Sequence, residues 1–196
     1  MHYILSILLV FLIGNCNHLI NESVIQEYTP NPAIQNHIYR TAIRFSNEKQ
    51  WAYDATYYNI GYPNGDVPTG GACTDVVIRV LRTQNIDLQQ LIHEDMSAAF
   101  EAYPNIWGLR QPDSNIDHRR VPNIMKYFER KGYSLTVSND ISDYKPGDIV
   151  TWKLGGKVTH IGICLENGDV YHNMGPYAKI DKEFLFQNMI IGHYRL

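Results

Sequence analysis

Residues 158–173 read VTHIGICLENGDVYHN, and the rest of the fold can be argued outward from this stretch. Apolar and polar positions alternate over 158–165 and again over 169–173, which is the period of a β-strand. The intervening Glu-Asn-Gly at 166–168 is a turn signal. The stretch therefore predicts an antiparallel hairpin with one histidine on each strand.

The length of the hairpin loop decides where the two histidines lie. A three-residue loop, with its glycine in the left-handed conformation, pairs Gly162 with His172 and makes His160 and His172 diagonal neighbours on one face, about 7–8 Å apart. A two-residue Asn-Gly loop would place them on opposite faces. Alternation also separates His160 from the apolar Ile161, so we expect the imidazole to face a cleft.

Helix-like and strand-like segments occupy different parts of the chain. Helical spacing of apolar residues occurs early, at 31–49, 73–83, 88–100 and 121–130. A loop rich in Gly, Pro and aromatic residues fills 51–71. Period-two runs come later, at 133–137, 148–153, 158–165, 169–173 and 190–195. Helices first and an antiparallel sheet afterwards predict an α+β domain.

Composition limits the class of protein. The 196 residues are enough for one domain with a sizeable core, and a hydrophobic content of 44% is that of a globular protein. The 20 acidic and 17 basic residues give a net charge of -3, without the concentrated basic face that nucleic-acid binding needs. We therefore expect no nucleic-acid partner.

The N-terminus has the features of an export signal. The apolar run at 3–13 is too short to span a bilayer. Residues 12–16, Leu-Ile-Gly-Asn-Cys, resemble the lipobox of bacterial lipoproteins. We expect a signal peptide at 1–16, a spacer at 17–30 and the folded domain at 31–196. The protein is then periplasmic or held in the cell envelope by a lipid on Cys16. A plain secreted protein and an uncleaved apolar tail are the alternatives.

Cys73 has the sequence context of a nucleophile. It follows Gly-Gly-Ala and opens the predicted helix 73–83, where unpaired N–H groups and the helix dipole favour a thiolate. We therefore expect the pKa of the Cys73 thiol to lie below its free value of about 8.5. Asp75 is expected on the other side of the helix, and the N–H of Cys73 could bind a developing oxyanion.

A thiolate, a base and a group that fixes the tautomer of the base are what acyl transfer needs, and Cys73, His160 and His172 would supply them. The alternative is structural, with Cys73 in the core and both histidines as hydrogen-bonded strand residues. No HExxH or CxxC pattern supports a metal site at His160, His172 and Cys164, so no metal is expected. Cys164 lies in an apolar strand, which argues against a disulfide with Cys73.

Three segments in a fixed order resemble the NlpC-type papain-like cysteine peptidases: KPGDIVTW at 145–152, THIGI at 159–163 and YHN at 171–173. The resemblance implies a papain-like fold in which a helix carrying Cys73, the nucleophile, packs on an antiparallel sheet. It further implies His160 as general base, His172 as the orienting residue, a cell-wall substrate and no cofactor.

The resemblance extends from about residue 53 to the C-terminus. More closely, the chain is similar to an uncharacterised bacterial domain family of the same papain-like clan, which shares stretches at 62–66, 73–77, 117–120 and 192–195. The wider superfamily places a tyrosine from before the cysteine at the oxyanion site, and Tyr62 is the nearest equivalent. Around the nucleophile the chain has Ala-Cys-Thr-Asp where the usual pattern is Asp-Cys-Ser-Gly, a departure that bears on substrate specificity.

Five further residues are candidates for substrate binding. Arg119 and Arg120 either lie on the surface or hold carboxylates of murein stem peptides with their guanidinium groups. Asp66 in the long loop and Trp152 beside the first histidine strand either line the cleft or serve as a turn residue and a core aromatic. Asn173, which completes the YHN segment, is included as a substrate contact.

The sequence thus predicts an exported, cysteine-dependent amide hydrolase that cleaves peptidoglycan or a related cell-surface peptide through a thioester acyl-enzyme. One alternative is an acyl or amide transferase with the same three residues, which differs only in the acceptor. The other is a catalytically inactive, lipid-anchored binding protein.

Overall fold

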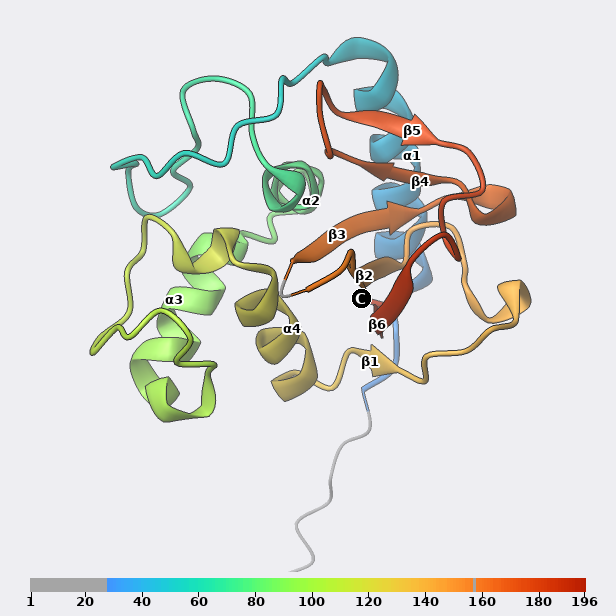
Figure 1. Cartoon of the computed structure of the whole chain (residues 1–196). Helices are drawn as coiled ribbons and strands as arrows, with labels where there is room; N and C mark the ends of the chain where they lie inside the picture. Colours follow the sequence, from blue (N-terminus) through green and yellow to red (C-terminus); the bar gives the residue numbers. More distant parts are fainter. Residues whose placement is uncertain (1–27, 157) are drawn as a thin grey trace, which may run out of the picture.

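The computed structural model describes residues 28–156 and 158–196 (Figure 1). The predicted signal peptide with Cys16, and the spacer as far as residue 27, lie outside the described residues. The helices are α1 (Pro32–Glu48), α2 (Cys73–Arg82), α3 (Leu88–Ala99) and α4 (Val121–Arg130). The strands are β1 (Ser134–Leu135), β2 (Ile149–Lys153), β3 (Thr159–Cys164), β4 (Val170–His172), β5 (Lys179–Asp181) and β6 (Met189–Tyr194). This order confirms the predicted α+β class. In the part described, none of the helices has both the length and the apolar character to cross a membrane.

The helices begin at residues that cap them. The side chain of Asn31 accepts a hydrogen bond from the second N–H of α1, and Pro32 fits the first turn because it has no N–H to satisfy. Asp87 caps α3 in the same way. Helix α2 is rich in β-branched residues, yet Val76, Val77 and Val80 are fully buried, so tertiary packing outweighs their strand propensity.

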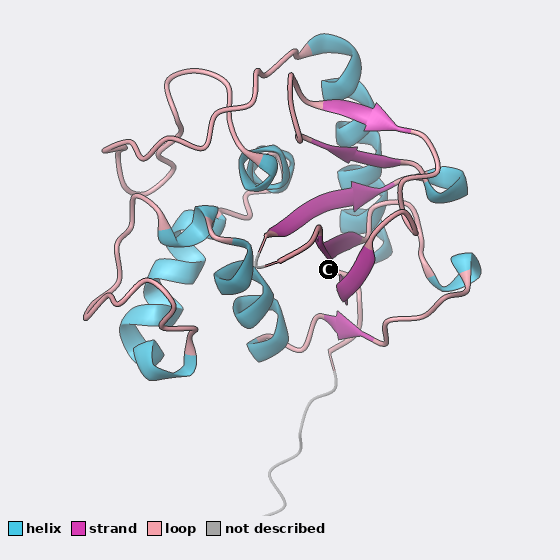
Figure 2. Cartoon of the chain, in the orientation of Figure 1, coloured by secondary structure: helices cyan, strands magenta, loops and turns pink. Residues whose placement is uncertain are grey.

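The strands form one antiparallel sheet in the order β1-β6-β2-β3-β4-β5. Helices α1, α2 and α4 all contact β3, and together they cover one face of the sheet (Figure 2). The main core lies there, between these helices and side chains such as Ile161 and Ile163. A second, smaller core covers the other face and includes Trp152, Cys164 and Phe184.

The sequence did not indicate β5, and it gave β1 three residues too many. Strand β5 is a half-buried edge strand of three residues that alternates little between apolar and polar, so no period-two pattern marks it. Strand β1 keeps only two of the residues predicted at 133–137.

The β3–β4 hairpin has the three-residue loop. The N–H of Leu165 bonds to the carbonyl of Asp169 at 2.8 Å, and the ladder continues through Ile163 opposite Tyr171. Gly168, at the last loop position, has φ 76°, which a side chain would disfavour. The predicted register is confirmed, and with it the placement of both histidines on one face.

Asp148 ties the start of β2 to the C-terminal strand. Its buried carboxylate accepts hydrogen bonds from Nε2 of His193 and from two nitrogens of Arg195, each at 2.7 Å. It also accepts the N–H of Lys145 and the side-chain amide of Gln35 on α1. One of these five bonds holds the imidazole of His193, which therefore has a structural role.

Replacing Asp148 with asparagine should therefore destabilise the fold by about 3–5 kcal/mol, because the Arg195 charge would lose its buried partner. Urea unfolding of the variant measures the loss. Asp143→Asn, at an exposed neighbouring carboxylate, is the matched control and should change stability by less than about 0.5 kcal/mol. Equal stability of the two variants would contradict the role given to Asp148.

Candidate active site

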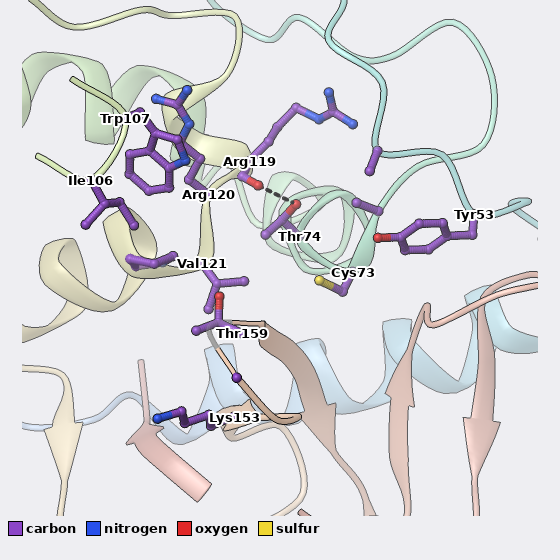
Figure 3. A pocket seen from close by; sticks show the side chains of 14 residues that line it. Tyr53, Cys73, Thr74, Ile106, Trp107, Arg119, Arg120, Val121, Lys153 and Thr159 are labelled. Atoms are coloured by element: carbon purple, nitrogen blue, oxygen red, sulfur yellow. Dashed lines mark hydrogen bonds between the residues drawn. The ribbon is translucent and has the colours of Figure 1, made fainter. Parts of the chain in front are cut away.

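Cys73 is the first residue of α2 and lines a cleft of about 710 Å³ (Figure 3). Ile106, Trp107 and Arg120 form one side of this cleft, and Tyr53 forms the other, with Cys73 between them. Only 8% of Cys73 is exposed, so the sulfur lies at the bottom of the opening. The helix start is closed by Asp75, whose carboxylate accepts the N–H of Ala72.

Helix α2 packs against β3, so Cys73 lies beside the start of this strand. The N–H of Cys164 bonds to Asp148 across the β2–β3 ladder, so alternate residues of β3, Ile161 among them, point their N–H groups toward β4. The β3–β4 pairing stops at Ile163. The backbone of Ile161, on this edge of β3, is close enough to the thiol of Cys73 to lower its pKa.

His160 and His172 form a hydrogen-bonded pair that continues to a carboxylate. Nε2 of His160 lies 2.7 Å from Nδ1 of His172, and Nε2 of His172 lies 3.0 Å from Oδ2 of Asp181 on β5. The other oxygen of Asp181 bonds to Nζ of Lys179 at 2.8 Å. Asp181 was not among the residues predicted from sequence.

The two histidines do not line the cleft. His160 is 3% exposed and its ring lies 5.9 Å from that of Trp152, on the face of the second core, whereas Cys73 packs with the main core. The expectation that His160 faces an open cleft is wrong, because Trp152 and Phe184 close over it. Cys73 and His160 thus pack on the two opposite faces of the sheet at β3.

The contacts of Asp181 determine the tautomers of both rings. A carboxylate only accepts, so Nε2 of His172 carries a proton and its Nδ1 is the acceptor. Nε2 of His160 must then donate to that Nδ1, which leaves the lone pair on Nδ1 of His160. Among residues 28–156 and 158–196 nothing hydrogen-bonds to this nitrogen, so it is free to accept a proton.

At rest, the thiol of Cys73 and the imidazole of His160 are both uncharged. Burial raises the pKa of Cys73 to about 11, with a further increase from Asp75 that the N–H of Ile161 partly offsets. Burial, with a contribution from His172, lowers the pKa of His160 to about 3. The prediction that the helix start lowers the thiol pKa is wrong, because desolvation outweighs it. Asp75, expected on the other side of the helix, folds its carboxylate back to the helix start, and its charge contributes to the raised pKa of Cys73.

The rate of alkylation of Cys73 by iodoacetamide should therefore rise about tenfold per pH unit between about pH 7 and pH 10, because only the thiolate reacts. Mass spectrometry of the Cys73 peptide measures this rate. The peptide of Cys164, whose pKa burial raises to about 12, is the internal control and should react more slowly. A rate that levels off below about pH 8 would show that the resting sulfur is a thiolate.

Tyr53, rather than Tyr62, is the tyrosine at the cleft. A bridge pairs Tyr53 with Gly71, two residues before Cys73, and Figure 3 shows its hydroxyl directed toward Cys73. Burial and then the nearby Cys73 raise the pKa of Tyr53. Tyr62 packs on His93 of α3 and is not part of the cleft lining.

Three other predicted contacts have structural roles. Asp66 forms an ion pair with Arg79 outside the cleft. Trp152 is fully buried, and its indole N–H donates to the carbonyl of Leu185. The side-chain amide of Asn173 donates to the carbonyl of Gly71 at 2.8 Å, so it fixes the turn before Cys73 instead of meeting solvent.

Arg119 and Arg120 differ in how much of the guanidinium group is already hydrogen-bonded within the protein. Arg119 is buried, and its guanidinium forms two bonds to Asp75, at 2.8 and 2.9 Å, and another to the carbonyl of Thr56. Arg119 therefore holds α2 against the long loop at 51–71. Its guanidinium has no pair of N–H groups left to bind a ligand carboxylate. Arg120 bonds to Asp117 through Nη1 only and lies over the ring of Trp107, at 4.1 Å from its centroid.

Cys73 and Cys164 are both free thiols. They belong to the two different cores, on opposite faces of the sheet. Within the described ranges, His, Cys, Asp and Glu side chains form no group of three or more with the spacing of a metal site.

The chain belongs to the family described as Domain of unknown function (DUF1287), whose model matches residues 41–196. Over 150 residues it is 47% identical to the uncharacterized protein YijF of Escherichia coli (strain K12), with 73% of each chain covered.

Two solved structures are also similar to this chain, each at 14% identity. The NlpC2 structure from Trichomonas vaginalis has a TM-score of 0.45 and covers 81% of this chain and 46% of its own. A Staphylococcus aureus Mu50 protein described as similar to lipoprotein, NLP/P60 family, has a TM-score of 0.44 and covers 87% of this chain and 44% of its own. This chain thus spans less than half the length of either protein.

Proposed function

We propose that this protein is a cysteine-dependent amide hydrolase of the cell envelope, with Cys73 as nucleophile and His160 as general base. The observation that carries the proposal is the chain of hydrogen bonds from Asp181 through His172 to His160, which directly precedes Ile161, the residue of β3 whose backbone affects the thiol of Cys73. The carboxylate of Asp181 fixes both tautomers, so Nδ1 of His160 keeps the lone pair that a general base requires.

The reaction follows from the neutral resting pair. Nδ1 of His160 takes the thiol proton as the sulfur of Cys73 attacks the carbonyl carbon, and the carbonyl electron pair moves onto oxygen. The oxyanion lies near the N–H of Cys73 and the hydroxyl of Tyr53. When the C–N bond breaks, the leaving amine takes the proton from His160. Water then loses a proton to His160 and attacks the thioester, which releases the acid and returns the proton to sulfur.

The substrate class rests on the sequence. The order and spacing of the KPGDIVTW, THIGI and YHN segments resemble those of NlpC-type peptidases, and the N-terminal residues have the pattern of an export signal. We therefore assign the activity to an amide bond of peptidoglycan, or of a related cell-surface peptide, and the protein to the periplasm or cell envelope.

The test is digestion of purified murein, with released fragments identified by mass spectrometry. The wild type should release peptide fragments with a new carboxyl terminus, and Cys73→Ala should release none. Cys164→Ser is the matched cysteine control and should behave as the wild type. Identical products from the wild type and Cys73→Ala would rule out the proposal. Products extended by an added amine would identify the transferase instead.

Asp181 is expected to act as a positioning residue. In Asp181→Asn the amide can donate to Nε2 of His172, which reverses both tautomers and puts the proton of His160 on Nδ1. We expect kcat to fall by about 100-fold or more while KM changes little. Nitrogen-15 NMR of His160 should show Nδ1 change from unprotonated to protonated.

Two variants separate this effect from a loss of structure. Asp181→Glu keeps the carboxylate and should recover part of the activity. Lys179→Gln removes only the ion pair to the other oxygen of Asp181 and should stay within about twofold of the wild type, because that pair is exposed. An unchanged Nδ1 signal in Asp181→Asn would contradict the positioning role.

A further inference from the structure

The charged groups that line the Cys73 cleft are all cationic. They are Arg119, Arg120 and Lys153, and no aspartate or glutamate of the described residues is part of the lining. The chain as a whole has more acidic than basic residues, 20 against 17. A cleft of one sign in a protein of the opposite net charge concentrates ligands of complementary charge.

Two of the three cations are available to a ligand. Arg119 is held by Asp75, but Arg120 has a single bond to Asp117 and presents the rest of its guanidinium beside Trp107. Lys153 is exposed at the end of β2, and within residues 28–156 and 158–196 no carboxylate pairs with it. Figure 3 shows Arg120 beside Trp107, and Lys153 beyond Thr159, with Cys73 in the same opening.

The same cleft offers an apolar wall. Ile106 is 67% exposed and Trp107 is 38% exposed, although both are large apolar side chains that folding normally covers. Trp107 is fixed in place by the guanidinium of Arg120 stacked on its ring. A ligand that brings both an apolar segment and a negative charge would satisfy the wall and the cations together.

We propose that the cleft selects acyl donors that carry a free carboxylate, which the positive charges of Arg120 and Lys153 attract while Trp107 and Ile106 hold the adjoining apolar part. The inference rests on the proposed function in taking Cys73 as the reacting group. It goes further by naming the ionic character of the substrate and the residues that determine it.

A pair of alkylating reagents of nearly equal size tests this without requiring hydrolysis. Iodoacetate carries a carboxylate and iodoacetamide does not, and both react with a thiolate by displacing iodide. We expect the ratio of their rates at Cys73, at about pH 9 and low salt, to exceed the ratio for N-acetylcysteine amide, a free thiol without a carboxylate, by about fivefold or more. Raising salt to about 1 M should remove the excess, because the Debye length falls to about 3 Å.

Variants then assign the effect to residues. Arg120→Gln and Lys153→Gln should each lower the ratio about threefold or more. Lys182→Gln is the matched control: it removes one positive charge that is paired with Asp169 and lies outside the cleft lining, and it should leave the ratio unchanged. Circular dichroism checks that each variant is folded.

The proposal is overturned if the ratio at Cys73 equals that of the free thiol, or if neither glutamine variant changes it. It is also overturned if neither reagent reaches Cys73, because the cleft would then be closed. Failure of the proposed function is a separate outcome. A protein that releases nothing from murein but still favours iodoacetate at Cys73 would retain a cleft for anions without amide hydrolysis.

Discussion

Cys73→Ala is expected to lower kcat/KM for amide cleavage by at least about 10⁴-fold, the largest effect of any single substitution in this protein. Without the sulfur no thioester can form, and the neighbouring N–H groups and His160 can assist only direct attack by water. The measurement is release of the amine from a murein-derived peptide under conditions where the wild type turns over many times.

The Cys73→Ala protein should remain folded. Cys73 is a small side chain at the edge of the main core, so its truncation removes little apolar area and should cost about 1 kcal/mol. Urea unfolding of Cys73→Ala checks this cost. Activity within tenfold of the wild type in a folded Cys73→Ala protein would mean that the sulfur is not the nucleophile.

His160→Gln should have the second largest effect, a loss of about 10³-fold in kcat/KM. The glutamine amide can still donate to Nδ1 of His172, so the hydrogen-bonded chain to Asp181 is preserved in part. It offers no basic lone pair to the thiol, and the pKa of Cys73, about 11, leaves almost no thiolate without a base. The residual rate should therefore increase with pH, whereas the wild-type rate should change little between about pH 6 and pH 9.

The pH profile separates chemistry from folding, because a merely destabilised variant would lose activity without gaining an alkaline dependence. His37→Gln, at a half-buried histidine of α1 that hydrogen-bonds to Thr83, is the matched control and should retain full activity. If His160→Gln keeps the flat profile of the wild type, the imidazole of His160 is not the base.

The hairpin could be predicted from sequence because its determinants are local. The Glu-Asn-Gly turn fixes the loop, and strict alternation then decides which residues share a face, so the pairing of His160 with His172 follows. The same reasoning did not predict that His160 and His172 are buried. Alternation assigns a residue to a face, but it does not show that Phe184, twelve residues after His172, covers that face.

Residues brought to the site by long-range contacts could not be predicted. Asp181 lies on a strand that has no periodic pattern, and Tyr53 reaches the cleft only because the long loop returns to pair it with Gly71. Counting back from Cys73 selected Tyr62 instead. The thiol pKa was misjudged for a related reason, since a helix start is visible in the sequence whereas burial depends on the whole fold.

The position of β6 in the sheet affects when the fold of this protein can be completed. Although β6 is the last strand along the chain, it lies between β1 and β2 and bonds to both. Arg195, directly after it, also neutralises the buried carboxylate that begins β2. A nascent chain still attached to the ribosome, or one still crossing a membrane, lacks β6. Cys73 is therefore synthesised before the sheet that supports the site can form.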